Sequence, residues 1–124
     1  MKRSQLLLLF AAFVLTTTSA WAQPTAKKAA AGSEDGVTTV IITVSATGED
    51  VYGVTIKGAK VEDIRAPKGW VGISSGSNAM FRTGENPVKS GSAVAFKVMT
   101  SEPSAGMTVS FRGKEDVVGE PIDL

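Results

Sequence analysis

The sequence predicts an all-β fold, an antiparallel β-sandwich of about seven to eight short strands, preceded by a signal peptide and a flexible tail. Apolar and polar residues alternate in several runs after Val37, and turn residues separate these runs every 8–12 residues or so. No run after Val37 has the 3.6-residue period of an amphipathic helix. Uneven strand lengths favour a sandwich over a barrel. The predicted organisation is a signal peptide over residues 1–22, a linker over 23–36 and one domain over 37–124.

The first 22 residues have the pattern of an export signal. Lys2 and Arg3 form a positive n-region, Leu6–Leu15 is an unbroken apolar h-region, and Ala20-Trp21-Ala22 fits the small-x-small rule for cleavage. An apolar helix of this length spans only about 15 Å, about half of a bilayer's hydrocarbon core. We therefore expect cleavage after Ala22, a periplasmic or extracellular protein and no membrane span once the signal is removed.

Residues 23–36 contain small and polar residues without apolar periodicity. A helix through Ala26–Ala31 would have no apolar face to pack, so it would be marginal in water. We interpret this segment as a flexible linker between the cleavage site and the domain.

The predicted strands follow from alternation and turn chemistry. In the first, Val40, Ile42 and Val44 share one face, and Ile41 on the other face suggests partial cover on both sides. The irregular segment Ala59–Arg65 is interpreted as a strand with a bulge. The expected strand segments are residues 37–46, 51–57, 59–65, 70–73, 79–83, 93–100, 107–112 and 117–124.

The stretch from Pro67 to Val98 contains the side chains expected to close the two sheets on each other. Pro67-Lys68-Gly69 predicts a turn, because proline presets φ and glycine tolerates positive φ. Trp70, Phe81 and Phe96 then fall on core faces. The connecting loops, Ser74–Asn78 and Gly84–Gly91, are the more promising places for function.

Composition excludes several kinds of chemistry. The chain has no cysteine and no histidine, which removes disulfides, thiolate chemistry and the commonest general base and metal ligand. Removing Lys2 and Arg3 from thirteen basic residues leaves eleven against twelve acidic, so the mature chain carries about one negative charge. Charges scattered singly along such a chain give no footprint for nucleic acid.

The remaining candidates for chemistry are weak. Acidic pairs at Glu49-Asp50, Glu62-Asp63 and Glu115-Asp116 could gather as calcium ligands or as the two carboxylates of a small hydrolase, but backbone preferences also place Asp and Glu in turns. Lys89 with Ser90 and Ser92 lacks the S-x-x-K pattern. We predict no enzyme, no catalytic residue, no metal site and no cofactor.

The larger apolar side chains are expected in the core. Four of the five mature aromatics lie on apolar faces or directly after a turn, among Tyr52, Trp70, Phe81, Phe96 and Phe111. Met80, Met99 and Met107 are mid-strand residues without a neighbouring His or Cys, so we expect them to fill the core rather than bind copper.

The C-terminal segment is predicted to be an edge strand, because Pro121 cannot donate a backbone hydrogen bond. Such an edge, with Ile122 and Leu124, could pair with another subunit.

The run from Ala66, with its P-x-G-W turn, its N-P and S-G break and the V-x-F-x-V strand, resembles small secreted bacterial β-sandwiches of the immunoglobulin-like or cohesin-like kind. The resemblance covers Val37 to Phe111 and implies binding or assembly without assigning any site residue. The Cys…Trp…Cys frame of immunoglobulin domains is absent.

We therefore expect an exported, non-catalytic binding or structural module with a protein or glycan partner. The alternatives are a small carboxylate- or metal-dependent hydrolase and a subunit of a cell-surface assembly. The ligand-binding residues and the oligomeric state are not predicted.

Overall fold

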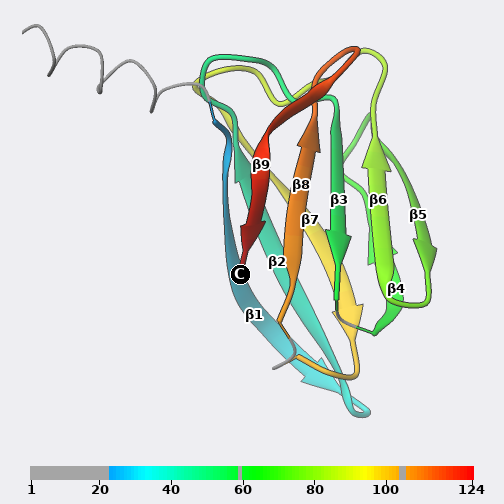
Figure 1. Cartoon of the computed structure of the whole chain (residues 1–124). Helices are drawn as coiled ribbons and strands as arrows, with labels where there is room; N and C mark the ends of the chain where they lie inside the picture. Colours follow the sequence, from blue (N-terminus) through cyan, green and yellow to red (C-terminus); the bar gives the residue numbers. More distant parts are fainter. Residues whose placement is uncertain (1–22, 59, 104–105) are drawn as a thin grey trace, which may run out of the picture.

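The computed structural model describes residues 23–58, 60–103 and 106–124. Within these residues the chain contains strands and connecting turns but no helix, which confirms the predicted all-β sandwich (Figure 1). The strands are β1 (Thr25–Glu34), β2 (Val37–Ser45), β3 (Gly53–Lys57), β4 (Val61–Arg65), β5 (Val71–Ser75), β6 (Asn78–Arg82), β7 (Ala93–Thr100), β8 (Thr108–Arg112) and β9 (Val117–Asp123).

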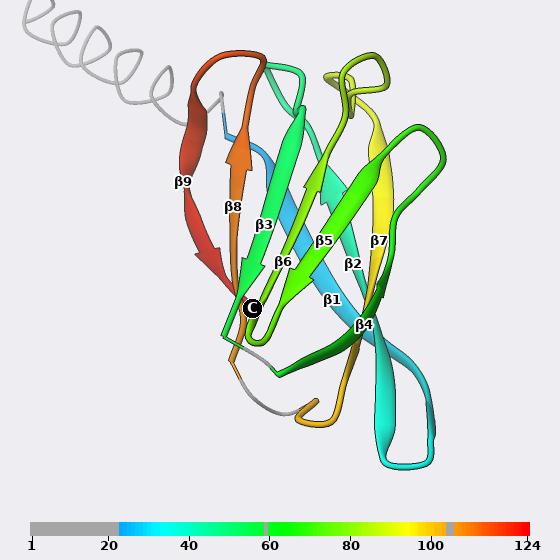
Figure 2. The ribbon, with the colours of Figure 1, turned by 90° about the vertical axis from the view of Figure 1, so that its right-hand side faces the viewer.

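The strands form two antiparallel sheets that pack face to face (Figure 2). The four-stranded sheet has the order β1-β2-β7-β4, and the five-stranded sheet has the order β5-β6-β3-β8-β9. The chain changes sheet between β2 and β3, again between β3 and β4, and at three later connections. Neighbouring strands are therefore often distant in sequence, as in β2 with β7 and β3 with β8.

The N-terminal segment differs from the prediction. Residues 23–36 are not a flexible linker, because β1 pairs with β2 from Thr25 opposite Ser45 to Glu34 opposite Val37. The backbone ladder supplies this order, since Ala26 is the only apolar β1 side chain packed against the core. A two-residue Asp35-Gly36 turn joins the strands with φ values of 54° and 80°, the left-handed conformation that a tight hairpin requires.

The eight strands predicted after Val37 are all present, each within a few residues of its expected bounds. In β2, Val40, Ile42 and Val44 are buried as their alternation predicts, and Ile41 on the outer face is half-buried. β4 has the expected irregularity, because its register with β7 shifts between Val61 and Asp63. The C-terminal segment forms β9 at an edge of the five-stranded sheet, as Pro121 predicts.

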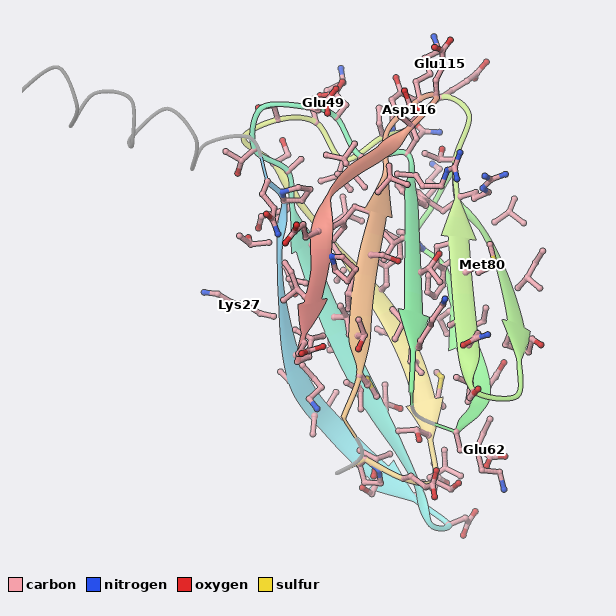
Figure 3. All side chains as sticks on the ribbon, in the orientation of Figure 1. Lys27, Glu49, Glu62, Met80, Glu115 and Asp116 are labelled. Carbon is pink, nitrogen blue, oxygen red and sulfur yellow. The ribbon has the colours of Figure 1, made fainter. Side chains whose placement is uncertain are left out.

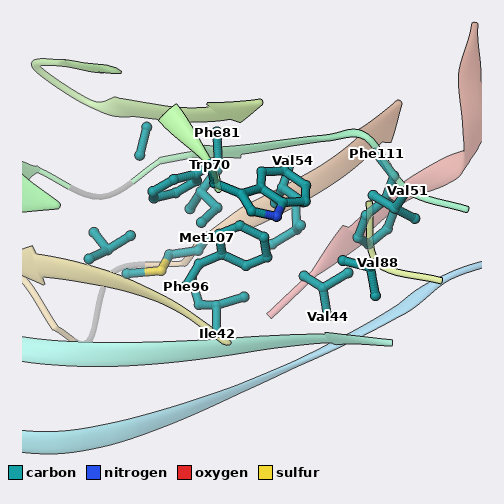
Figure 4. Close-up of a cluster of buried hydrophobic side chains, with 14 of the residues drawn as sticks. Ile42, Val44, Val51, Val54, Trp70, Phe81, Val88, Phe96, Met107 and Phe111 are labelled. Carbon is teal, nitrogen blue, oxygen red and sulfur yellow. The ribbon is translucent and has the colours of Figure 1, made fainter. Parts of the chain in front are cut away.

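Three aromatic residues join the two sheets at the centre of the core (Figure 4). Phe96 of β7 meets Trp70 edge-on, with ring centroids 4.9 Å apart and planes at 81°. It also lies 4.9 Å from the ring of Phe81 in the opposite sheet. Such pairs contribute about 0.5–1.5 kcal/mol beyond area burial. The predicted core role of these residues and of Phe111 is confirmed, since all four are buried.

The predicted signal peptide and its cleavage after Ala22 lie outside the described residues. In the part of the chain that the structure describes, no helix is long and apolar enough to cross a membrane.

Candidate functional site

The outer face of the five-stranded sheet carries one row of residues that register places side by side. Arg82 of β6 lies opposite Gly53 of β3, and Gly53 lies opposite Arg112 of β8. Val71 of β5 and Val117 of β9 continue the row at either side. Two arginines therefore stand two strands apart, about 10 Å between backbones, with no side chain between them.

Gly53 creates the gap between the arginines. A Cβ atom built at this position would lie 3.3 Å from the Cβ of Arg112, so a larger residue would crowd the arginine. Thr55 and Lys57 follow Gly53 on the outer face of β3, and Lys57 lies about 13 Å from Gly53 along the strand. These three residues share the outer face because side chains alternate along a strand, and Val54 and Ile56 between them point into the core.

Two hollows along β3 meet at these arginines. One, of about 270 Å³, is lined by Tyr52, Gly53, Arg82, Arg112 and Lys114 together with neighbouring loop residues. The other, of about 380 Å³, lies over Thr55, Lys57, Ser110 and Met80 and shares both arginines with the first. We call the surface formed by Gly53, Thr55, Lys57, Arg82, Arg112 and Lys114 the basic groove.

The basic groove is positively charged although the mature chain is expected to be nearly neutral. Four cations line the two hollows, and no aspartate or glutamate does so. One of the four, Lys114, also lines the neighbouring hollow that Glu49, Glu115 and Asp116 share. Within the described residues the single ion pair is Lys60 with Glu62, at 3.7 Å and away from the groove. Arg112 donates from Nη2 to the backbone oxygen of Glu115 at 3.4 Å, which leaves most of its donors available.

Exposed apolar side chains flank the basic groove. Val71, Ile73 and Val117 are 67%, 65% and 64% exposed. Met80 is 43% exposed and projects outward from β6 (Figure 3), so the prediction that it fills the core is wrong. The prediction holds for Met107, which is buried, but not for Met99, which lies on the outer face of β7 and lines a surface hollow. Alternation places Met80 outward because its neighbours Ala79 and Phe81 occupy the core face.

The predicted acidic pairs do not form one cluster. Glu49 joins Glu115 and Asp116 around a hollow at one end of the sandwich, whereas Glu62 and Asp63 lie at the other end (Figure 3). Over the residues that the structure describes, no three acidic side chains lie close enough to hold a metal ion.

Two carboxylates of these pairs, Asp50 and Asp63, accept hydrogen bonds from the backbone. Asp50 accepts a hydrogen bond from the backbone N–H of Ser90 at 2.9 Å, and Asp63 accepts one from Ile64 at 2.8 Å. Turn chemistry accounts for the position of Asp50, whereas Asp63 lies within β4, at its irregularity.

The two loops favoured for function are pinned by hydrogen bonds. Ser74–Asn78 is shorter than predicted, because β5 and β6 continue through it and leave only a Gly76-Ser77 turn. Gly84–Gly91 is a true connection, but Val88 within it is buried and pairs with Val51 through two 2.9 Å backbone bonds.

Lys89, Ser90 and Ser92 have structural contacts in the same loop. Ser90 Oγ accepts a hydrogen bond from the Gly48 N–H at 3.0 Å, and the Ser92 N–H donates to the Lys89 oxygen at 2.8 Å. These contacts stabilise the loop against the segment that follows β2.

The two side chains expected to make β9 a pairing edge pack against their own domain. Ile122 and Leu124 are half-buried against the core, and the Leu124 N–H donates to the Met107 oxygen at 2.8 Å. Gln23 Nε2 also donates to the Glu120 oxygen at 3.2 Å beside this edge.

Comparisons with known proteins leave the chain without an assigned family. No family model matches it, and no curated protein matches it. Among solved structures it is similar to a GH20 exo-β-N-acetylglucosaminidase from Vibrio harveyi in complex with N-acetylglucosamine, and to an inactive D437A mutant of that enzyme. Each similarity has 8% identity and a TM-score of 0.49, and covers 82% of this chain but only 17% of the enzyme's.

Proposed function

We propose that this protein is an exported, non-catalytic binding module that recognises a carboxylate-bearing protein partner on the basic groove. The observation that carries the proposal is the cross-strand row in which Arg82 and Arg112 flank the side-chain gap at Gly53, with no carboxylate lining the groove. Guanidinium groups bind carboxylates through paired, charge-assisted hydrogen bonds.

The surroundings of the groove favour protein over glycan. Val71, Ile73, Met80 and Val117 offer exposed aliphatic contacts beside the two arginines, and Met and Arg are among the residue types enriched in protein–protein interfaces. Binding of sugar rings or bases typically uses exposed aromatic faces. The two aromatic residues that line the hollows are Tyr52, which is half-buried, and Phe111, which is buried.

Export and the non-catalytic role are proposed from observations other than the groove. Export is proposed from the n-region, h-region and cleavage pattern of residues 1–22. A non-catalytic role is proposed because the chain has no histidine or cysteine, and because Glu62 and Asp63 lie at the opposite end of the sandwich from the hollow that Glu49, Glu115 and Asp116 share. The likeness to immunoglobulin-like or cohesin-like modules remains a prediction with the same functional implication.

Calorimetric titration with poly-L-glutamate tests the proposal, with polygalacturonate as an acidic glycan and dextran as a neutral one. We expect poly-L-glutamate to bind, and the double variant Arg82→Gln, Arg112→Gln to lose about tenfold in affinity, equivalent to about 1.4 kcal/mol. The matched control is Lys68→Gln with Lys89→Gln, two exposed cations outside the groove. Equal loss in both variants would contradict the groove, and binding of polygalacturonate alone would reassign it to glycans.

A further inference from the structure

The β1–β2 hairpin is the most protruding part of the described chain. Its tip extends beyond the other connections at that end of the sandwich (Figure 2). Every residue from Ala29 to Gly36 is exposed. The two-residue Asp35-Gly36 turn is among the narrowest ways to reverse a chain.

Neither strand propensity nor packing against the core accounts for the residues of this hairpin. Ala29, Ala30, Ala31 and Gly32 have poor strand propensity and no contact with the core. They make the β1 side of the hairpin slender, because none carries more than a methyl group. The tip carries the carboxylates of Glu34 and Asp35, which line one hollow with Glu62, Asp63 and the single cation Arg65.

We infer that a second copy of this chain fills the basic groove with its β1–β2 hairpin, so that copies join head to tail. The inference rests on the proposed function, because it identifies the carboxylate-bearing partner of the same groove. A slender acidic projection and a cationic groove without acidic lining occur on the same polypeptide, on different sheets. Complementary charge of this kind steers association and sets its register.

The groove offers contacts suited to such a tip. Arg82 and Arg112 stand on both sides of the gap at Gly53, where the carboxylates of Glu34 and Asp35 would enter. The hydroxyls of Thr55 and Ser110, on the adjacent strands β3 and β8, are placed to hydrogen-bond the turn backbone. A hairpin and a groove on different sheets form a heterologous contact, which propagates as an open chain unless its rotation closes a ring.

Analytical ultracentrifugation over a wide range of protein concentration tests this inference. We expect the sedimentation coefficient of the unmodified protein to rise with concentration and to fall in high salt. A hairpin variant, Glu34→Lys with Asp35→Asn, and a groove variant, Arg82→Glu with Arg112→Glu, should each remain monomeric. Asparagine is chosen because it tolerates the positive φ at position 35.

Mixing these two variants provides the decisive step, because each reversed surface then meets a complementary one. The mixture should associate again, whereas the control Lys68→Glu with Lys89→Glu should behave as the unmodified protein. A monomer at every concentration, association unaffected by either variant, or a mixture that stays monomeric would each overturn the inference. If a charge reversal unfolds the domain, the milder Arg82→Gln, Arg112→Gln variant replaces it and must still lose self-association.

The outcome is separable from that of the proposed function. A monomeric protein that binds poly-L-glutamate through Arg82 and Arg112 would refute self-assembly and keep the groove. A protein that associates through another surface, with no effect of the groove variant on either assay, would refute both.

Discussion

Replacing Phe96 by alanine should remove the contact on which the two sheets close. Phe96 is fully buried, and its ring packs against Trp70 and Phe81 at 4.9 Å centroid distances. A buried aromatic side chain removes about 150 Å² or more from water, which at about 25 cal/mol/Å² corresponds to about 4 kcal/mol. Measured Phe→Ala substitutions in cores cost about 3–5 kcal/mol.

This loss is large compared with the stability of a domain of this size, about 5–15 kcal/mol in total. We therefore expect Phe96→Ala to lower the melting temperature by about 15–30 °C. Urea denaturation followed by Trp70 fluorescence gives the free energy of unfolding, because Trp70 is the one tryptophan in the described residues and sits beside the substitution.

Two controls make this test specific. Phe96→Leu keeps most of the buried volume and should cost clearly less than alanine. Met80→Ala removes a side chain that is 43% exposed on the outer face and should change stability by no more than about 0.5 kcal/mol. A loss of unfolding free energy below about 1.5 kcal/mol for Phe96→Ala, or one equal to that of Met80→Ala, would refute the claim that Phe96, Trp70 and Phe81 form the centre of the core.

Two further substitutions test local geometry by the same denaturation assay. Gly72→Ala should lower the free energy of unfolding by about 1–2 kcal/mol, because the added Cβ would lie 2.8 Å from Ile64 Cδ1 and 3.1 Å from the Phe81 ring. Gly84→Ala, where the added Cβ would meet open space, should be neutral. Equal effects of the two substitutions would show that β5 does not approach the core this closely. Asp35→Ala should lower the free energy of unfolding by about 1 kcal/mol, and Asp35→Asn should hardly change it, because φ at this position is 54° and asparagine tolerates this left-handed conformation better than alanine. The reverse order would contradict the tight turn.

The strands after Val37 could be predicted because each has its own signal. Period-2 alternation and turn residues are local properties of the chain, so β2, β7 and β8 follow directly from the sequence. β1 could not be found this way, because its residues do not alternate between apolar and polar. The Asp35-Gly36 dipeptide was the available signal, since it favours a two-residue hairpin turn.

Alternation also does not say which face of a strand is covered. Val71 and Ile73 were expected in a strand of the core region, yet both point outward, and Gly72 between them lies against the core side chains of Ile64 and Phe81. Only the packing of β5 at the edge of its sheet determines this orientation.

The basic groove could not be predicted because its residues come from three separate segments. Gly53 to Lys57, Arg82, and Arg112 with Lys114 are brought together by the pairing of β3 with β6 and β8. Along the sequence each of these charges is isolated, which suggests no binding surface. Strand register, a long-range property, gathers them on one face.

The most direct measurement for the central claim is NMR chemical-shift mapping of the protein during titration with poly-L-glutamate. If poly-L-glutamate binds in the groove, saturable chemical-shift changes should centre on the amides of Gly53, Thr55, Arg82 and Arg112. The affinity should fall as salt is added, because the Debye length, about 8 Å at physiological ionic strength, becomes shorter and screens the charges. Shifts concentrated in the Gly84–Gly91 loop or on the outer face of the four-stranded sheet, with the groove amides unmoved, would contradict the account.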